Sequence, residues 1–208
     1  RKYEAVSTNS ALPIYPDYMD VTVPVNIAPL NFHYTSDGIR KVRTVVSYKD
    51  AVHTFDGKEV VWDLQQWKQL LASAQGDSIA FSSEIRLKGG KKETLEWKVY
   101  VSEDKIDPYL SYRLIEPGYE VWHEVEIRER CIENFEERAI SDWKNTNNSC
   151  MNCHIHSQAR ADLSMFYVRG KNGGAFLNRN GEVRKLSLND KSLISGTVYG
   201  EIHPSGRY

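Results

Sequence analysis

The segment "DSIAFSSEIRLKGGKKETLEWKVYVSE", residues 77–103, carries the clearest structural signal in this sequence. Apolar residues occupy every other position of its second half: Leu95, Trp97, Val99 and Val101. Alternation with a period of two is typical of a strand with one buried face. The Gly89-Gly90 pair between the two halves indicates a tight turn, so the segment predicts an antiparallel hairpin.

Similar strand signals lie on both sides of this hairpin. "VTVPVNIAPLNFHY" alternates from Val21 to Ile27, and its two prolines confine it to a sheet edge or a bulged strand. Asp56-Gly57 suits a type I′ turn and predicts a hairpin within "AVHTFDGKEVVW". Two more strands are expected on either side of Pro117-Gly118. Together these signals predict a mainly β protein with an antiparallel β-sandwich over residues 21–130.

Residues 63–74, "DLQQWKQLLASA", show the one good helical pattern. Its apolar residues share one face of a helix: Leu64, Trp67, Leu70, Leu71 and Ala74. Asp63 can cap the start, and Gly76 follows the end. We therefore expect one short helix covering the strands.

The remaining parts are predicted from their composition and turns. Residues 1–20 hold two prolines and no period, which indicates an extended arm laid on the domain. Residues 131–165 begin with a polar, charged stretch that predicts a loop. Asn180-Gly181 predicts another hairpin within residues 166–208, and the chain stops where we expect a further strand.

Composition and charge exclude some classes of function. The net charge is -1, so no field draws in nucleic acid or an anionic membrane. No apolar run approaches the roughly 20 residues of a membrane span. The chain begins at Arg1 without an initiator methionine, so we expect a processed or partial form, consistent with loss of a signal peptide or lipid anchor.

Two of the three cysteines lie in "NTNNSCMNCHIHSQ", residues 145–158, where Cys150, Cys153 and His154 form a C-x-x-C-H pentad. This string is a signal for attachment of c-type haem. Two thiols about one helical turn apart can bond the two vinyl groups, and the following imidazole can bind the iron. The pentad therefore predicts haem c on Cys150 and Cys153, with His154 as the proximal ligand.

A second axial ligand would set the reduction potential of that haem. Met165 lies eleven residues after His154, far enough along the chain to fold over the ring. It is our first candidate for the distal ligand, and a core residue of the strand "SMFYVRG" is the equal alternative. The other histidines are expected to be surface, packing or turn residues.

Three other interpretations of the pentad stay open. A zinc site would use Cys150, Cys153, His154 or His156, and Cys131. A redox or structural disulfide would join the two cysteines of the pentad, although the surroundings lack the βαβ context of thioredoxin-like motifs. The pentad can also arise by chance. We favour the haem.

Five motifs in this order carry a wider resemblance: "YPDYMDVTVPVNIAPLNF", "ENFEER", "CMNCH", "VRGKNGG" and "IHPSGRY". The chain resembles a group of secreted Gram-negative proteins labelled cytochrome-c-like. In that group a β-sandwich and a C-x-N-C-H segment precede a TolB-like propeller. The resemblance implies a periplasmic or cell-surface location, and residues 166–208 look like the start of a propeller. After the pentad, His156 and "SQARADL" depart from the group's pattern.

We expect an extracytoplasmic cytochrome c module that carries one haem and passes electrons to a redox partner in the cell envelope. The alternative is an envelope binding or scaffold protein in which the pentad is structural or binds another metal. An enzyme, such as a peroxidase with an open distal site, is the weakest class. The sequence shows no Ser-His-Asp order, no phosphate-binding glycine loop and no clear carboxylate pair.

Overall fold

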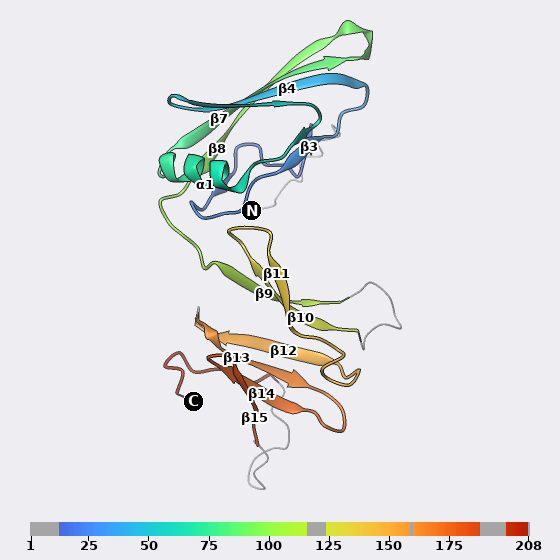
Figure 1. The fold of residues 1–208 in the computed structure, drawn as a ribbon, viewed down its shortest axis with the longest axis vertical. Helices are drawn as coiled ribbons and strands as arrows, with labels where there is room; N and C mark the ends of the chain where they lie inside the picture. The colour runs from blue at the N-terminus through green and yellow to red at the C-terminus, as the bar shows by residue number, and fades with distance from the viewer. Residues whose placement is uncertain (1–12, 116–123, 159, 188–198, 208) are drawn as a thin grey trace, which may run out of the picture. The chain divides into compact units, whose positions relative to one another are not determined.

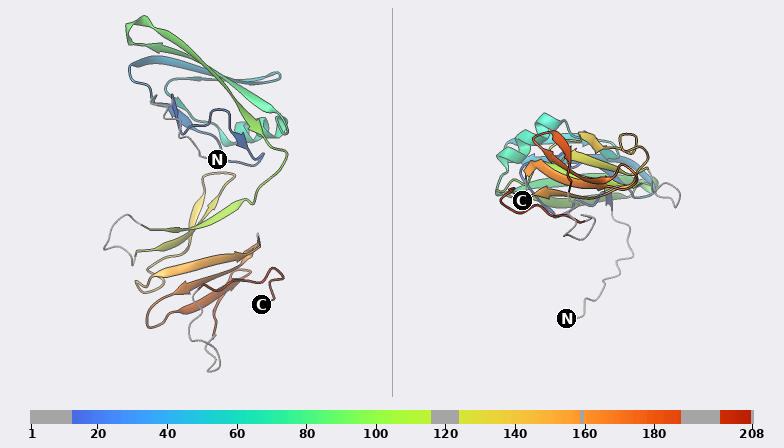
Figure 2. Two further views of the ribbon diagram at one scale, coloured as in Figure 1. Left: turned by 180° about the vertical axis from the view of Figure 1, so that it is seen from behind. Right: turned by 90° about the horizontal axis from the view of Figure 1, so that it is seen from below.

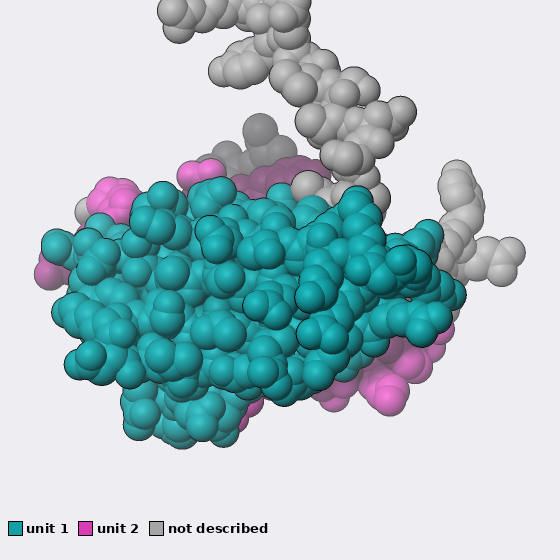
Figure 3. Space-filling view, turned by 90° about the horizontal axis from the view of Figure 1, so that it is seen from above, with its two compact units in different colours: residues 1–106 teal, residues 107–208 magenta. Residues whose placement is uncertain are grey.

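A computed structural model of the chain describes residues 13–115, 124–158, 160–187 and 199–207 (Figure 1). The chain divides into two compact units, residues 1–106 and 107–208, which Figure 3 colours separately. Both units are built from antiparallel strands, and none of the sheets formed by the described strands closes into a barrel. The prediction of a mainly β fold is confirmed.

Unit 1 contains a five-stranded sheet in the order β2-β8-β7-β4-β5. Its strands are β2 (Thr22–Val23), β4 (Ile39–Tyr48), β5 (Ala51–Asp56), β7 (Ser78–Leu87) and β8 (Lys92–Val101). β7 and β8 form the predicted hairpin around Gly89-Gly90. Only β2, at the edge, runs parallel to its neighbour, and it is shorter than the alternation from Val21 to Ile27 predicts.

A small sheet and a helix cover one face of this five-stranded sheet (Figure 1). The small sheet has the order β1-β3-β6. Its strands are β1 (Ile14–Tyr15), β3 (Phe32–Tyr34) and β6 (Glu59–Val60). Helix α1 (Leu64–Ser73) begins at its predicted cap, where the Asp63 carboxylate accepts hydrogen bonds from two backbone N–H groups at 3.0 Å. Trp67, Leu70 and Leu71 of α1 are buried, as the helical pattern predicts.

The hairpin predicted at Asp56-Gly57 is wrong. β6 follows this dipeptide but pairs with β3, opposite Phe32 and His33, and not with β5. β5 instead forms its hairpin with β4, where Tyr48 and Ala51 pair across a two-residue turn. Burial of Val60, which is fully inaccessible in the core, outweighs the local turn preference of Asp-Gly.

Unit 2 consists of two sheets, which lie one above the other in Figures 1 and 2. The first has the order β11-β10-β9, with β9 (Tyr109–Leu114), β10 (Glu126–Cys131) and β11 (Glu137–Ser141). The second has the order β12-β13-β14-β15, with β12 (Met151–Ser157), β13 (Arg160–Val168), β14 (Gly174–Arg179) and β15 (Glu182–Lys185). The Asn180-Gly181 hairpin is confirmed, because Arg179 pairs with Glu182 and both turn residues have positive φ.

The boundaries of the two units differ from those of the predicted domains. β9 and β10 form one sheet with β11 and belong to unit 2, whereas the sandwich was predicted to continue to residue 130. The segment 131–165, predicted to start as a loop, contains β11, β12 and the first six residues of β13. Residues 14–15 of the predicted arm form β1, in which Ile14 is fully buried. Pro117-Gly118 and most of the arm lie outside the described residues.

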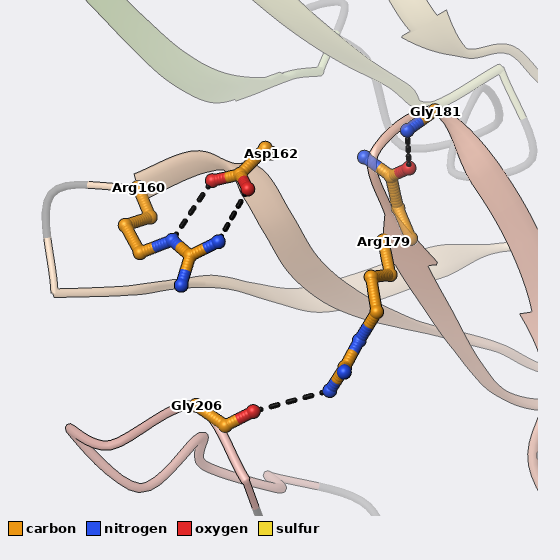
Figure 4. A network of polar contacts seen from close by, with 6 residues as sticks. Arg160, Asp162, Arg179, Gly181 and Gly206 are labelled. Atoms are coloured by element: carbon orange, nitrogen blue, oxygen red, sulfur yellow. Dashed lines mark hydrogen bonds and ion pairs between the residues drawn. The ribbon is translucent and has the colours of Figure 1, made fainter.

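Among the described residues, no helix has the length and apolar character needed to cross a membrane. The terminal turn over residues 199–207 packs on the second sheet of unit 2. The guanidinium of Arg179 donates to the carbonyl of Gly206 at 3.1 Å (Figure 4). A Cβ on Gly206 would lie 3.0 Å from Cδ2 of Leu163, so only glycine fits this close approach without a shift.

Candidate functional site

The C-x-x-C-H pentad lies on β12, at the edge of the four-stranded sheet of unit 2. Cys150 directly precedes the strand, and its carbonyl accepts a hydrogen bond from the N–H of Arg169 at 2.9 Å. Met151 is fully buried in the apolar cluster of the unit. The pentad is therefore part of a packed sheet and not part of a helix or a free loop.

A β-bulge interrupts β12 at the second cysteine of the pentad. Asn152 pairs with Tyr167 and Ile155 pairs with Met165, so Cys153 and His154 together oppose Phe166. Cys153 has a φ of 55°. This left-handed conformation costs an L-residue other than glycine about 1–2 kcal/mol. Bulges with such strain often mark functional positions.

Asn152 holds this strained conformation. Its side-chain oxygen Oδ1 accepts hydrogen bonds from the N–H of Cys153 at 2.9 Å and from Nη1 of Arg113. Arg113 belongs to β9 of the other sheet, so the contact fixes the bulge to both sheets. We call Asn152 and Arg113 the bulge clamp. The clamp offsets the cost of the left-handed residue.

The donor groups of the pentad are available for bonding. Cys150 and Cys153 are free, partly exposed thiols. The imidazole of His154 is partly buried and forms no hydrogen bond with another described residue. Two free thiols and one free imidazole are the groups that attachment of haem c requires. They lie on or directly before a bulged strand and not in the helical turn that the sequence prediction assumed.

The geometry supports the zinc and disulfide interpretations of the pentad less well. The third free cysteine, Cys131, is buried on β10 in the other sheet. Within the described ranges, no group of three or more His, Cys, Asp or Glu residues is placed to hold a metal ion. The structure thus does not assemble the predicted zinc ligands, and it joins no pair of described cysteines in a disulfide.

A pocket of about 380 Å³ adjoins the pentad. Ser149, the neighbour of Cys150, lines its rim, and Phe166, which opposes the bulge, lines its apolar wall together with Val168 and Phe176. The aromatic rings of Phe166 and Phe176 stack with centroids 5.5 Å apart. No residue of the pentad lines the pocket, and polar residues line most of the rest of it, among them Asn145, Thr146 and Asn172.

Met165, the predicted distal ligand, is a buried residue of β13. A Cβ on Gly200 would lie 2.4 Å from its methyl carbon, so the side chain packs against that glycine. Alternate residues of a strand face opposite sides, so Met165 faces away from Phe166 and from the bulge. This placement fits the core alternative. To bind an iron held by His154, Met165 would have to leave its packing site.

Polar side chains also join the two sheets of unit 2. The sequence did not identify these residues as a site. Nδ1 of His156 and Oγ of Ser111 lie 3.1 Å apart across the sandwich. Burial, and to a lesser degree the neighbouring His154, lower the pKa of His156, while Glu129 acts in the opposite direction. Glu129 is buried on β10, and its Oε1 accepts from Nε of Arg138 at 2.8 Å.

The sequence missed these residues for a physical reason. Ser111 of β9 and Glu129 of β10 are direct cross-strand partners, and their approach to His156 depends on how the two sheets stack. Arg113 is one of many charged residues without a local motif. Asn152 carries a weak signal, since it lies inside the pentad.

Compared with models of known protein families, with curated proteins and with solved structures, the chain matches none of them. Its function is therefore argued from its own residues.

Proposed function

We propose that this chain is an extracytoplasmic cytochrome c module with one haem bonded to Cys150 and Cys153, and that it transfers electrons to a partner in the cell envelope. The observation that carries the proposal is the clamped bulge at Cys153, next to two free thiols and an unbonded imidazole. Backbone strain that neighbouring groups hold in place is typical of functional sites.

The residues of the chain would divide the work as follows. Cys150 and Cys153 supply the two sulfur atoms that fix the group, and His154 supplies an axial nitrogen. The bulge clamp keeps Cys153 and His154 projecting from the same point of the strand, because both oppose Phe166. When bound, haem supplies an iron that exchanges one electron at a potential set by its ligands and surroundings.

Met165 stays our predicted distal ligand. To bind the iron, its side chain would have to leave its packing site against Gly200. The periplasm or cell surface follows as the proposed location. The remainder of the proposal, a propeller that continues from residues 166–208, rests on the resemblance of "IHPSGRY" to a propeller turn.

The test is production of the chain with an export signal in a Gram-negative host that has the haem-attachment machinery. We expect sharp α and β bands in the reduced spectrum, and we expect the colour to stay with the protein in acid acetone. Cys150→Ala and Cys153→Ala should each weaken retention, and the matched variant Cys131→Ala should not. Colourless wild-type protein with reduced thiols would contradict the proposal.

A specific observation favours the alternative of an envelope binding or scaffold protein. Met151 inside the pentad is fully buried, so the motif also takes part in packing unit 2. If the thiols carry no haem, the pentad is a structural part of the sandwich.

A further inference from the structure

Unit 2 has an open cavity at the polar end of its sandwich. The cavity has a volume of about 440 Å³. Its wall consists of residues 107–111 at the start of β9, together with Glu129, His156 and Arg160. Its size lies within the range of pockets that bind small molecules.

Two polar atoms on the cavity wall lack a hydrogen bond. Only Oε1 of Glu129 is engaged, by Nε and Nη2 of Arg138 at 2.8 and 2.7 Å. The second oxygen, Oε2, has no hydrogen-bond partner in the part of the chain that the structure describes. The same holds for Nε2 of His156, because Ser111 engages only Nδ1.

Oε2 of Glu129 makes this part of the cavity wall a hydrogen-bond acceptor. The Glu129 side chain is only 8% exposed, so its carboxylate gains little from bulk solvent. The cavity therefore suits a ligand that donates a hydrogen bond to this oxygen.

The charges around the cavity favour a cation. Arg160 is already paired with Asp162 through two contacts, as Figure 4 shows. Including the partners of the paired groups, three carboxylates (Asp107, Glu129 and Asp162) stand against two guanidinium groups (Arg138 and Arg160), a net charge of -1. An anionic ligand would have to compete with Asp162 for Arg160.

An apolar lip borders the cavity. Tyr109 and Leu110 are 52% and 57% exposed, and Pro108 lies beside them. The face of a tyrosine ring attracts an ammonium group placed above it. The lip thus offers apolar contact to the body of a ligand.

We propose that this cavity is a binding site for a small organic amine. Its ammonium group donates to Oε2 of Glu129, and its apolar body lies on Tyr109 and Leu110. The site is separate from the thiols of the pentad, and the proposal does not depend on a bound haem.

The test uses three probes of similar shape and different charge with the full chain at neutral pH: 2-phenylethylamine, 2-phenylethanol and 3-phenylpropionate. Binding is measured by calorimetric titration. We expect saturable binding of the amine, binding of the alcohol at least about tenfold weaker, and no binding of the carboxylate. Equal affinities for the three probes, or preference for the carboxylate, would overturn the proposal.

Substitutions locate the binding. Glu129→Gln should weaken amine binding at least about tenfold, and Glu182→Gln, an exposed glutamate on β15, should leave it unchanged. If Glu129→Gln does not fold, Asp107→Asn and Tyr109→Leu test the site instead, because both residues are exposed and tolerate substitution. Each should weaken the amine, and unchanged affinity in both would remove the site.

Discussion

The two units bury different kinds of interior. The core of unit 1 is one apolar cluster of twenty-one buried residues. Three hydroxyl groups within this core form hydrogen bonds with one another. The hydroxyl of Tyr34 bonds Thr44 at 2.7 Å and also bonds Ser83, and these two bond each other at 3.3 Å. The apolar cluster of unit 2 has only four buried residues. Its interior also holds buried apolar residues outside that cluster, such as Leu163 and Met165, and the polar groups of His156, Ser111 and Glu129.

This difference indicates a division of labour. The indole N–H groups of Trp62 and Trp97 in the core of unit 1 are buried without a hydrogen-bond partner among the described residues. A core of this kind stabilises a fold but offers no thiol, imidazole or carboxylate. The interior of unit 2 presents free thiols, an unbonded imidazole and a buried carboxylate with an unbonded oxygen. We therefore expect unit 1 to be the stable part and unit 2 to carry the chemistry.

The largest effect is expected in the core of unit 1. Trp67 is fully buried in α1, and its Nε1 donates to the carbonyl of Ile27 at 3.0 Å. Trp67→Ala should lower the free energy of unfolding by about 3–5 kcal/mol. Hydrogen exchange measured by mass spectrometry should show the loss in peptides of residues 13–106, and exposed Gln66→Ala should show none. Equal loss of protection in both units would show that they do not have separate cores.

A smaller effect is expected for Met165 in unit 2. Met165→Ala removes a buried side chain and should lower the free energy of unfolding of unit 2 by about 2–5 kcal/mol. Denaturant unfolding of the haem-free chain measures this loss. In the haem-containing protein, a change from a low-spin to a high-spin spectrum would identify Met165 as the distal ligand, and an unchanged spectrum would assign it to the core. Met151→Ala, which removes a methionine of the apolar cluster, is the matched control.

The bulge predicts that replacing Cys153 by glycine destabilises the protein less than replacing it by alanine. At a φ of 55°, glycine is free of the strain that any L-residue has. Cys153→Gly should therefore be more stable than Cys153→Ala by about 1–2 kcal/mol, although neither has a thiol. Midpoints of urea unfolding measure the difference. If alanine were the more stable residue, Cys153 would not be in the left-handed conformation, and the argument for the clamp would fail.

An effect of similar size is expected for the hydroxyl of Tyr34 in unit 1. Tyr34→Phe removes the hydrogen bonds to Thr44 and Ser83 and should cost about 0.5–1.5 kcal/mol per bond.

The same residue makes stability depend on pH. Burial raises the pKa of Tyr34 above its usual value. A raised pKa in the folded state stabilises the fold below the unfolded pKa of about 10, and this stability is lost as pH rises through the folded pKa. Unit 1 should therefore weaken above about pH 10, and Tyr34→Phe should remove that part of the dependence. Alkaline titration of near-ultraviolet absorbance, with exposed Tyr100→Phe as the control, measures it.

The sequence predicted those elements whose signals are local. Helix α1 followed from Asp63 and the apolar face of the helix, and the hairpins at Gly89-Gly90 and Asn180-Gly181 followed from turn residues. Asp56-Gly57 failed because Val60 gains more from pairing in the small sheet than from a local hairpin. Long-range pairing is not encoded by adjacent residues.

The candidate site also combines residues that the sequence identifies with residues that only the structure identifies. The pentad is contiguous, so Cys150, Cys153 and His154 could be identified from the sequence. The left-handed conformation of Cys153 and its clamp could not, because Arg113 reaches Asn152 from the other sheet. The approach of Ser111 to His156 likewise depends on sheet stacking.

The intact mass of the exported protein under denaturing conditions tests the central claim most directly. Thioether bonds survive unfolding, so we predict a mass of the polypeptide plus one haem, which is lost when Cys150 and Cys153 are both replaced by alanine. A mass equal to the bare polypeptide, in a host that attaches haem to a control cytochrome, would contradict the account.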